Sequence, residues 1–123
     1  MLELTLHVKP LTINRAWRGR HFSTAAKEEF EMRLRYSLPK VAVVGKPFYR
    51  VEYDLHLVSF RAMDWDNCIK VLQDCLVARG IISDDSLIVH AVVRKYPAKK
   101  DRVVVRIEPY NIPVGELEVP GAA

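Results

Sequence analysis

Alternation of apolar and polar residues predicts four β-strands in this chain. Residues 2–8 alternate in the manner of a half-buried strand, and Pro10 ends this segment. The most regular alternation covers residues 49–57, where tyrosine, valine and leucine take every second position. Two more strands are predicted over residues 87–96 and 102–108. The sequence PAKKD between them predicts a turn, so we expect these two strands to pair as a β-hairpin.

Helical periodicity predicts a first helix over about residues 24–38. Ser23 or Thr24 is its expected N-cap, and Pro39 is its expected stop. Apolar residues recur every fourth position on its core-facing side: Ala26, Phe30, Leu34 and Leu38. The segment before it, residues 11–23, is too irregular for a strand or a helix.

A second helix is predicted between the second and third strands. Asp66 is a favourable N-cap, and Gly80 is suited to end the helix. Ile69, Leu72 and Leu76 form its apolar stripe. The resulting order β-α-β-α-β-β predicts an α+β fold, with a mixed β-sheet of about four strands and two main helices packed on it.

The size of the chain predicts a single domain. It has 123 residues, half of them hydrophobic, and we expect a globular domain over residues 1–109 and an irregular tail over residues 110–123. No segment has the ~20 apolar residues of a membrane span, and the N-terminal residues lack a signal-peptide pattern. Cys68 and Cys75 lie on one predicted helix with Cα atoms about 10 Å apart, beyond disulfide reach. We therefore expect a cytoplasmic protein with free thiols and no membrane association.

Candidate chemistry is concentrated around the second predicted helix. Acidic residues lie at both of its ends and charged residues lie within it: Asp64, Asp66, Lys70, Asp74, Asp84 and Asp85. A structural explanation exists, because aspartates before helices are often caps and charges four apart form surface pairs worth about 0.2–0.5 kcal/mol each. The two acidic pairs together favour a metal site, because four carboxylates around one short helix repel each other unless a cation binds them. Mg²⁺ takes such oxygen ligands, and Lys70 can offset the charge of a bound phosphate.

The basic residues indicate a polyanionic partner. The formal net charge is +4, and Arg15, Arg18 and Arg20 share a loop with Trp17. A second basic cluster surrounds the predicted turn: Arg94, Lys95, Lys99, Lys100 and Arg102. Such clusters near a carboxylate site fit a phosphodiester substrate. The alternatives are that these side chains only solvate the surface and that Trp17 is a core residue.

The residues around the aspartates resemble those of a known family. The motif is closely similar to that of the RusA family of Holliday junction resolvases and consists of Asp64, Asp66, Asn67 and Lys70, continued by Asp74, Gly80, Asp84 and Asp85. The segment PLTINRAWR, residues 10–18, also resembles the N-terminal segment of that family, and the similarity covers about residues 4–108. Met63 departs from the pattern, because a basic residue often precedes the first aspartate; here Arg61 lies two places upstream.

This resemblance implies a compact α/β fold, a symmetric homodimer and an endonuclease that resolves four-way junction DNA by paired nicks in recombination and repair. It implies Mg²⁺ as the cofactor, with Mn²⁺ as a substitute and no organic cofactor, in a bacterial or phage-encoded protein. By this resemblance the metal ligands are Asp64, Asp66 and Asp85, and Lys70 is also catalytic. Asp84 and Asp74 are candidates to assist. The expected DNA contacts are Asn14, Arg15, Trp17, Arg18, Arg20, Lys99 and Lys100.

The expected mechanism is metal-assisted hydrolysis, in which Asp64, Asp66 and Asp85 converge on one or two Mg²⁺ ions. Lys70 would then stabilise negative charge on the leaving oxygen. Two other classes of function stay open. The chain can be a non-catalytic DNA-binding or regulatory protein on the same fold, or a small phosphohydrolase that uses Asp64 as a nucleophile.

Overall fold

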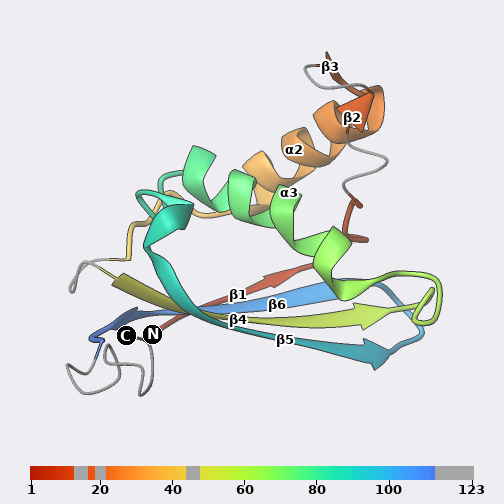
Figure 1. The fold of residues 1–123 in the computed structure, drawn as a ribbon. Helices are drawn as coiled ribbons and strands as arrows, with labels where there is room; N and C mark the ends of the chain where they lie inside the picture. Colours follow the sequence, from red (N-terminus) through yellow and green to blue (C-terminus); the bar gives the residue numbers. More distant parts are fainter. Residues whose placement is uncertain (13–16, 19–21, 44–47, 113–123) are drawn as a thin grey trace, which may run out of the picture.

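The computed structural model describes residues 1–12, 17–18, 22–43 and 48–112, and only the backbone of residues 17–18 and 22–23. Its elements, labelled as in Figure 1, are β1 (Leu2–Leu6), β2 (Trp17–Arg18), β3 (Phe22–Ser23), α2 (Ala25–Ser37), β4 (Phe48–Leu57), α3 (Trp65–Ala78), the 3₁₀ turn η1 (Asp85–Leu87), β5 (Ile88–Pro97) and β6 (Arg102–Tyr110). A mixed sheet with two helices confirms the predicted α+β fold.

The main sheet has the strand order β1-β6-β4-β5. β6 pairs antiparallel with both β1 and β4, whereas β4 and β5 are parallel. Both helices cover the same face of this sheet (Figure 1). None of the helices in the described part of the chain combines the length and the apolar character that a membrane crossing requires.

The predicted hairpin between the last two strands is wrong, because β4 lies between β5 and β6. Burial explains this order. Val103, Val105 and Ile107 of β6 are completely buried, whereas no residue of β5 is. β6 is thus a central strand whose core-facing side is completely covered, whereas β5 is a partly exposed edge strand. The connection between β5 and β6 crosses the end of β4, where Asp101 Oδ1 accepts a hydrogen bond from the Val58 amide at 2.9 Å.

The segment over residues 11–23 was expected to be irregular, and this is wrong in part. Trp17–Arg18 and Phe22–Ser23 form a short antiparallel pair. Strands of two residues are too short to show an alternating pattern, so the sequence gives no signal for them. The last strand reaches Tyr110, one residue into the predicted tail, and residues 113–123 lie outside the described part.

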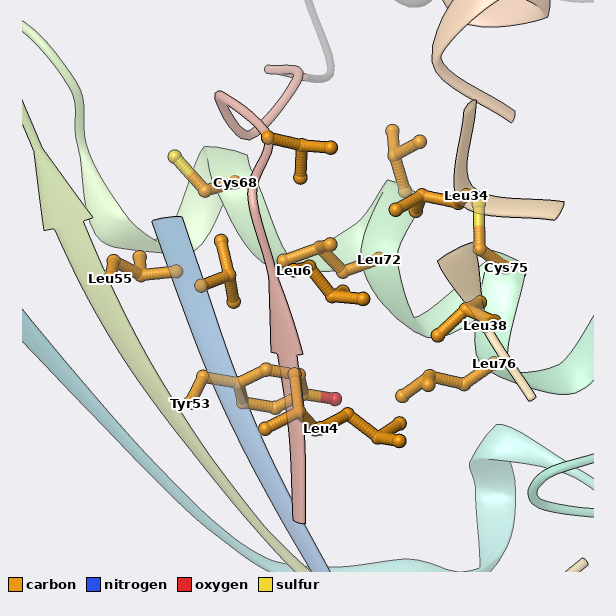
Figure 2. Close-up of a cluster of buried hydrophobic side chains, with 14 of the residues drawn as sticks. Leu4, Leu6, Leu34, Leu38, Tyr53, Leu55, Cys68, Leu72, Cys75 and Leu76 are labelled. Atoms are coloured by element: carbon orange, nitrogen blue, oxygen red, sulfur yellow. The ribbon is translucent and has the colours of Figure 1, made fainter. Parts of the chain in front are cut away.

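The hydrophobic core fills the space between the sheet and the two helices. Figure 2 shows Leu4 and Leu6 of β1 together with Tyr53 and Leu55 of β4, facing side chains from both helices. The buried residues of α3 are Cys68, Val71, Leu72, Cys75 and Leu76. Complete burial of a leucine contributes about 1.5–3 kcal/mol, so this layer anchors α3 firmly on the sheet.

Both cysteines are free and buried, as expected for a chain without a disulfide. Burial raises the pKa of the Cys75 thiol to about 11, and it also raises the pKa of Cys68. These side chains therefore act as small apolar core residues rather than as nucleophiles.

The ends of the helices follow local sequence signals. Thr24 caps α2 as predicted, and its side chain accepts a hydrogen bond from the Lys27 amide at 3.2 Å. The predicted N-cap Asp66 is wrong, because α3 starts two residues earlier than expected and Asp64 is its N-cap. Gly80 ends α3 as predicted, with a φ of +79° that favours glycine. Its amide donates to a carbonyl of the last turn at 2.9 Å.

The sheet face opposite the helices carries an ion-pair network centred on Asp54. This carboxylate is only 7% exposed and accepts hydrogen bonds from Arg94 at 3.0 Å and from Arg106 at 2.6 Å. Glu52 accepts from Arg94 at 3.2 Å and from Arg50 at 2.8 Å. Burial opposes ionisation of Asp54, but the two guanidinium groups outweigh it and lower its pKa. The network thus connects β4, β5 and β6.

We predict that Asp54→Asn lowers the free energy of unfolding at pH 7 by about 2 kcal/mol, because it weakens charge-assisted hydrogen bonds to two arginines. The lowered pKa means that the carboxylate stabilises the fold above its unfolded value of about 3.9 and loses this effect as the pH falls through the folded value. The difference between parent and variant should therefore shrink in acid. Urea denaturation at pH 7 and pH 3 measures it.

The matched control is Glu3→Gln, which removes an exposed carboxylate paired with Arg106 at 3.1 Å. Exposed pairs contribute about 0–1 kcal/mol, so this change should be small. Equal unfolding midpoints for the parent and Asp54→Asn at pH 7 would contradict a stabilising role for the network.

Candidate active site

The carboxylates of Asp64 and Asp66 are exposed at the start of α3. Asp64 occupies the N-cap position, but its side chain makes no capping hydrogen bond. Within the described residues, no hydrogen bond or ion pair engages either carboxylate. Capping therefore does not explain the pair. The partial positive charge of the helix N-terminus favours negative charge here, and both side chains are free to bind a cation.

A cavity of about 440 Å³ adjoins Asp64. Its lining joins the segment after β1 to the start of α3 and consists of Lys9, Pro10, Leu11, Thr12, Ala62, Met63, Asp64 and Asn67. Asn67 and Lys9 were not among the predicted site residues. The motif itself carried a signal for Asn67, which directly follows Asp66, whereas Lys9 in the first strand pattern carried none. Lys9, with its positive charge, and the amide residue Asn67 thus line the same cavity as Asp64.

Lys70 forms a second charged cluster one turn further along α3. Its Nζ donates to Asp74 Oδ1 at 2.9 Å and to Asp85 Oδ2 at 3.2 Å. The hydrogen bond with Asp74, together with that to Asp85, raises the pKa of Lys70, so the group stays an ammonium at neutral pH. Half of this side chain is exposed, and such pairs contribute little to stability.

The two residues of the second acidic pair, Asp84 and Asp85, have different roles. Asp84 caps η1, because its Oδ1 accepts a hydrogen bond from the Ser86 amide at 3.0 Å, and this bond lowers its pKa. Asp85 instead faces Lys70. The charge of Asp85 also acts on Tyr53 of β4: burial raises the pKa of the Tyr53 hydroxyl, and the negative charge of Asp85 raises it further. Asp84 thus has a structural role, whereas Asp85 is held at the Lys70 cluster.

The structure does not gather the three predicted metal carboxylates within one chain. Asp64 follows the end of β4 and Asp85 precedes the start of β5, and these strands are parallel. The two residues therefore lie toward opposite ends of the sheet, joined by α3, which spans about 21 Å (Figure 1). Among the residues that the structure describes, no group of three His, Cys, Asp or Glu side chains is placed to hold a metal ion. Convergence of the three carboxylates stays a prediction for an assembly of two chains.

The predicted DNA contacts are described only in part. Lys99 and Lys100 are exposed between β5 and β6, at the end of the sheet where α3 begins. Trp17 and Arg18 form β2, for which only the backbone is described. Three further predicted contacts lie outside the described residues: Asn14, Arg15 and Arg20.

Lys95 fixes the approach to Asp64, a role that the sequence analysis did not predict. Its Nζ donates to the Met63 carbonyl at 2.6 Å and lies 4.7 Å from the centroid of the Phe60 ring. A signal was present, because Lys95 alternates with Val93 on the helix-facing side of β5, where a lysine is unusual. Arg94 points to the other face, so the predicted basic cluster is divided between the two faces of the sheet.

Comparisons with known proteins agree with this motif. A family model described as Endodeoxyribonuclease RusA matches residues 14–108. A curated protein of Aquifex aeolicus (strain VF5), named Crossover junction endodeoxyribonuclease RusA, is 28% identical over 92% of this chain and 97% of its own length. The resemblance seen in the motif is thereby confirmed, and the matched segment contains every candidate catalytic aspartate and Lys70.

We predict that Lys70→Met loosens η1 without unfolding the domain, because it removes the ammonium that holds Asp85 against α3. Amide exchange of Leu87, whose N–H bonds to the Asp84 carbonyl at 3.2 Å, should accelerate about threefold, in line with an exposed pair worth less than 1 kcal/mol. Asp74→Asn is the control, since it leaves the contact between Lys70 and Asp85 in place. Unchanged Leu87 exchange in Lys70→Met would show that this contact does not hold η1.

Proposed function

Because the chain belongs to the RusA family of endodeoxyribonucleases, we propose that it is a metal-dependent nuclease that resolves four-way DNA junctions in recombination and repair. The observation that carries this proposal is the exposed pair Asp64 and Asp66, placed at a helix N-terminus without a capping role. The name of the Aquifex aeolicus relative, a crossover junction endodeoxyribonuclease, supports a junction as the substrate. The exposed Lys99 and Lys100 at the same end of the sheet fit a polyanion.

The donor chemistry of the pair fits Mg²⁺. This ion is usually bound through one or two carboxylates, with water and substrate phosphate completing its shell. Asp64 and Asp66 would hold it, and Mn²⁺, which takes the same kind of ligand, is the expected substitute. When bound, such an ion would polarise the scissile phosphate and lower the pKa of an attacking water.

The chain's own residues would position the DNA around this pair. Lys70 keeps its charge at neutral pH and can donate to a phosphate or leaving oxygen once it leaves Asp85. Lys9, Thr12 and Asn67 line the cavity beside Asp64 and offer donors to the sugar–phosphate backbone. Positioning of this kind is the main requirement for displacement at a phosphodiester.

We also propose a symmetric homodimer. Resolution of a junction needs two symmetric nicks, and a two-fold dimer offers two equivalent sites. A dimer also provides a way to complete the carboxylate set, because Asp85 of one subunit can approach Asp64 and Asp66 of the other. This arrangement would reconcile the motif with the separation of these residues along α3.

Asp66→Asn should abolish cutting but spare binding. A neutral amide is a much poorer ligand for a hard cation, so the cleavage rate in Mg²⁺ should fall about a hundredfold or more, beyond the loss typical of outer-shell groups. Junction affinity in Ca²⁺ or EDTA should stay the same or rise, because a negative charge facing the phosphates is lost. A cleavage time course and a gel-shift titration measure the two effects.

Glu29→Gln is the matched control, since it makes the same chemical change at an exposed position of α2. Cutting by Asp66→Asn at the parental rate would refute the proposed mechanism. A parent protein that binds junctions but does not nick them in Mg²⁺ would favour a non-catalytic binding protein instead.

Mixed dimers test how the site is assembled. If Asp85 acts across the interface, a dimer of one Asp66→Asn subunit and one Asp85→Asn subunit has one doubly changed site and one intact site. It should nick one strand of the junction, although both variant homodimers are inactive. If Asp85 acts within its own subunit, both sites of the mixed dimer are damaged and no nick should appear.

The mixed dimers are isolated with two different affinity tags, and dimers of two differently tagged Asp66→Asn subunits serve as the inactive control. Sedimentation establishes the dimer itself, with an expected mass of twice the 14.1 kDa chain. A purely monomeric parent at micromolar concentration would contradict the homodimer.

A further inference from the structure

Trp65 is an exposed tryptophan that lies directly between the two candidate metal-binding carboxylates in the sequence. It is the first residue of α3, and 54% of its surface is exposed. Within the described part of the chain, no hydrogen bond or ring contact engages its indole. Large aromatic side chains are usually buried, and those left at a surface are enriched where a partner binds.

The core does not account for Trp65. Ile69, one turn later, packs against the core together with Phe60 of the preceding loop, but in the described structure Trp65 belongs neither to the core nor to the residues packed against it. The side chains that anchor α3 on the sheet all come later in the helix, from Cys68 onward. Packing of α3 on the sheet therefore does not require an apolar side chain at Trp65.

The loop between β4 and α3, which precedes Trp65, is held in place at both of its ends. Lys95 fixes the Met63 carbonyl, two residues before the tryptophan, at 2.6 Å. The start of the same loop is fixed where Asp101 accepts from the Val58 amide at 2.9 Å, and the Ala98 amide donates to the end of β4 at 3.0 Å. An aromatic ring on a braced segment loses little conformational freedom when a flat ligand packs on it.

The charges around this segment suit a nucleic acid. Arg61 in the same loop and Lys99 and Lys100 in the adjoining connection are all exposed. Lys95 adds a further positive charge beneath the loop. Aromatic side chains interleaved with cations are the usual surface for bases that are not enclosed in a duplex, because the ring stacks on the base while the cations follow the phosphates.

We propose that Trp65 stacks on an unpaired or unstacked base next to the phosphate that a metal ion at Asp64 and Asp66 would bind, and so selects junction DNA over plain duplex. This inference rests on the proposed function. In a continuous duplex both faces of each base are covered by its neighbours, whereas strands that exchange at a crossover can expose a face. A ring placed beside the cutting site can bind that face, and the scissile phosphate then lies at the carboxylate pair.

Three variants of the full chain test this role. Trp65→Ala removes the ring, Trp65→Phe keeps a smaller one, and Tyr36→Ala removes an exposed aromatic from α2 as the matched control. Binding to a four-way junction and to duplex of the same length is measured by gel shift in EDTA, where no cutting occurs. Circular dichroism and urea midpoints verify that each variant is folded. Quenching of tryptophan emission by the junction is compared between the parent and Trp65→Phe.

We expect Trp65→Ala to weaken junction binding about tenfold, as is typical for loss of one base-stacking ring, and to change duplex binding less than twofold. Trp65→Phe should stay within about threefold of the parent but show less quenching, because only Trp17 then remains as an emitter, and Tyr36→Ala should match the parent. Parental junction affinity in Trp65→Ala, or an equal loss for junction and duplex, overturns the stacking role.

Other results are equally decisive. If Trp65→Ala sediments as a monomer while the parent is a dimer, Trp65 is a subunit contact and the stacking role is refuted. A parent that binds and nicks junctions while Trp65→Ala binds them normally refutes this inference and leaves the proposed function standing. A parent that neither binds nor nicks junctions refutes both.

Discussion

Parallel pairing of β4 with β5 is the constraint on which the arrangement of the candidate site depends. Two parallel neighbours require a crossover, and α3 supplies it by running back over the sheet from the end of β4 to the start of β5. The two acidic pairs of the motif lie at the two ends of this crossover. One continuous motif in the sequence thus becomes two sites in space, with Lys70 and Asp74 between them. The separation follows from topology and not from any single side chain.

The contrast between Asp64 and Asp84 shows how local geometry distinguishes aspartates that look alike in sequence. Both occupy N-cap positions, yet only Asp84 accepts a backbone hydrogen bond with its side chain. Its oxygen is therefore partly satisfied within the fold. The carboxylate of Asp64 leaves its ligand capacity unused within the described structure, at a position where the helix dipole favours an anion. The same type of residue at the same type of position thus stabilises a turn in one place and presents ligand oxygens in the other.

Local patterns predicted most of the elements and the composition of the site, because alternation, helical periodicity, the Thr24 cap and the Gly80 stop act over a few residues. The pairing of strands depends on distant partners. The hairpin expectation failed because the burial of Val105 on a central strand cannot be judged without knowing what covers it. The distance between Asp85 and Asp64 within one chain also depends on distant partners, since it is set by the crossover. The roles of Lys95 and Trp65 could be assigned only from the structure, which shows that Lys95 is bonded to the Met63 carbonyl and that Trp65 is exposed.

The network around Asp54 also affects how a polyanion would encounter this protein. Its arginines are matched by carboxylates on the same sheet face, and the connected groups are Arg50, Arg94, Arg106, Glu3, Glu52, Asp54 and Glu108. This set carries a charge of −1, which leaves +5 for the remainder of a chain whose total is +4. The excess positive charge of the chain therefore lies outside this network. Long-range attraction would draw a polyanion toward those other residues and not toward the matched charges around Asp54, most strongly at low ionic strength.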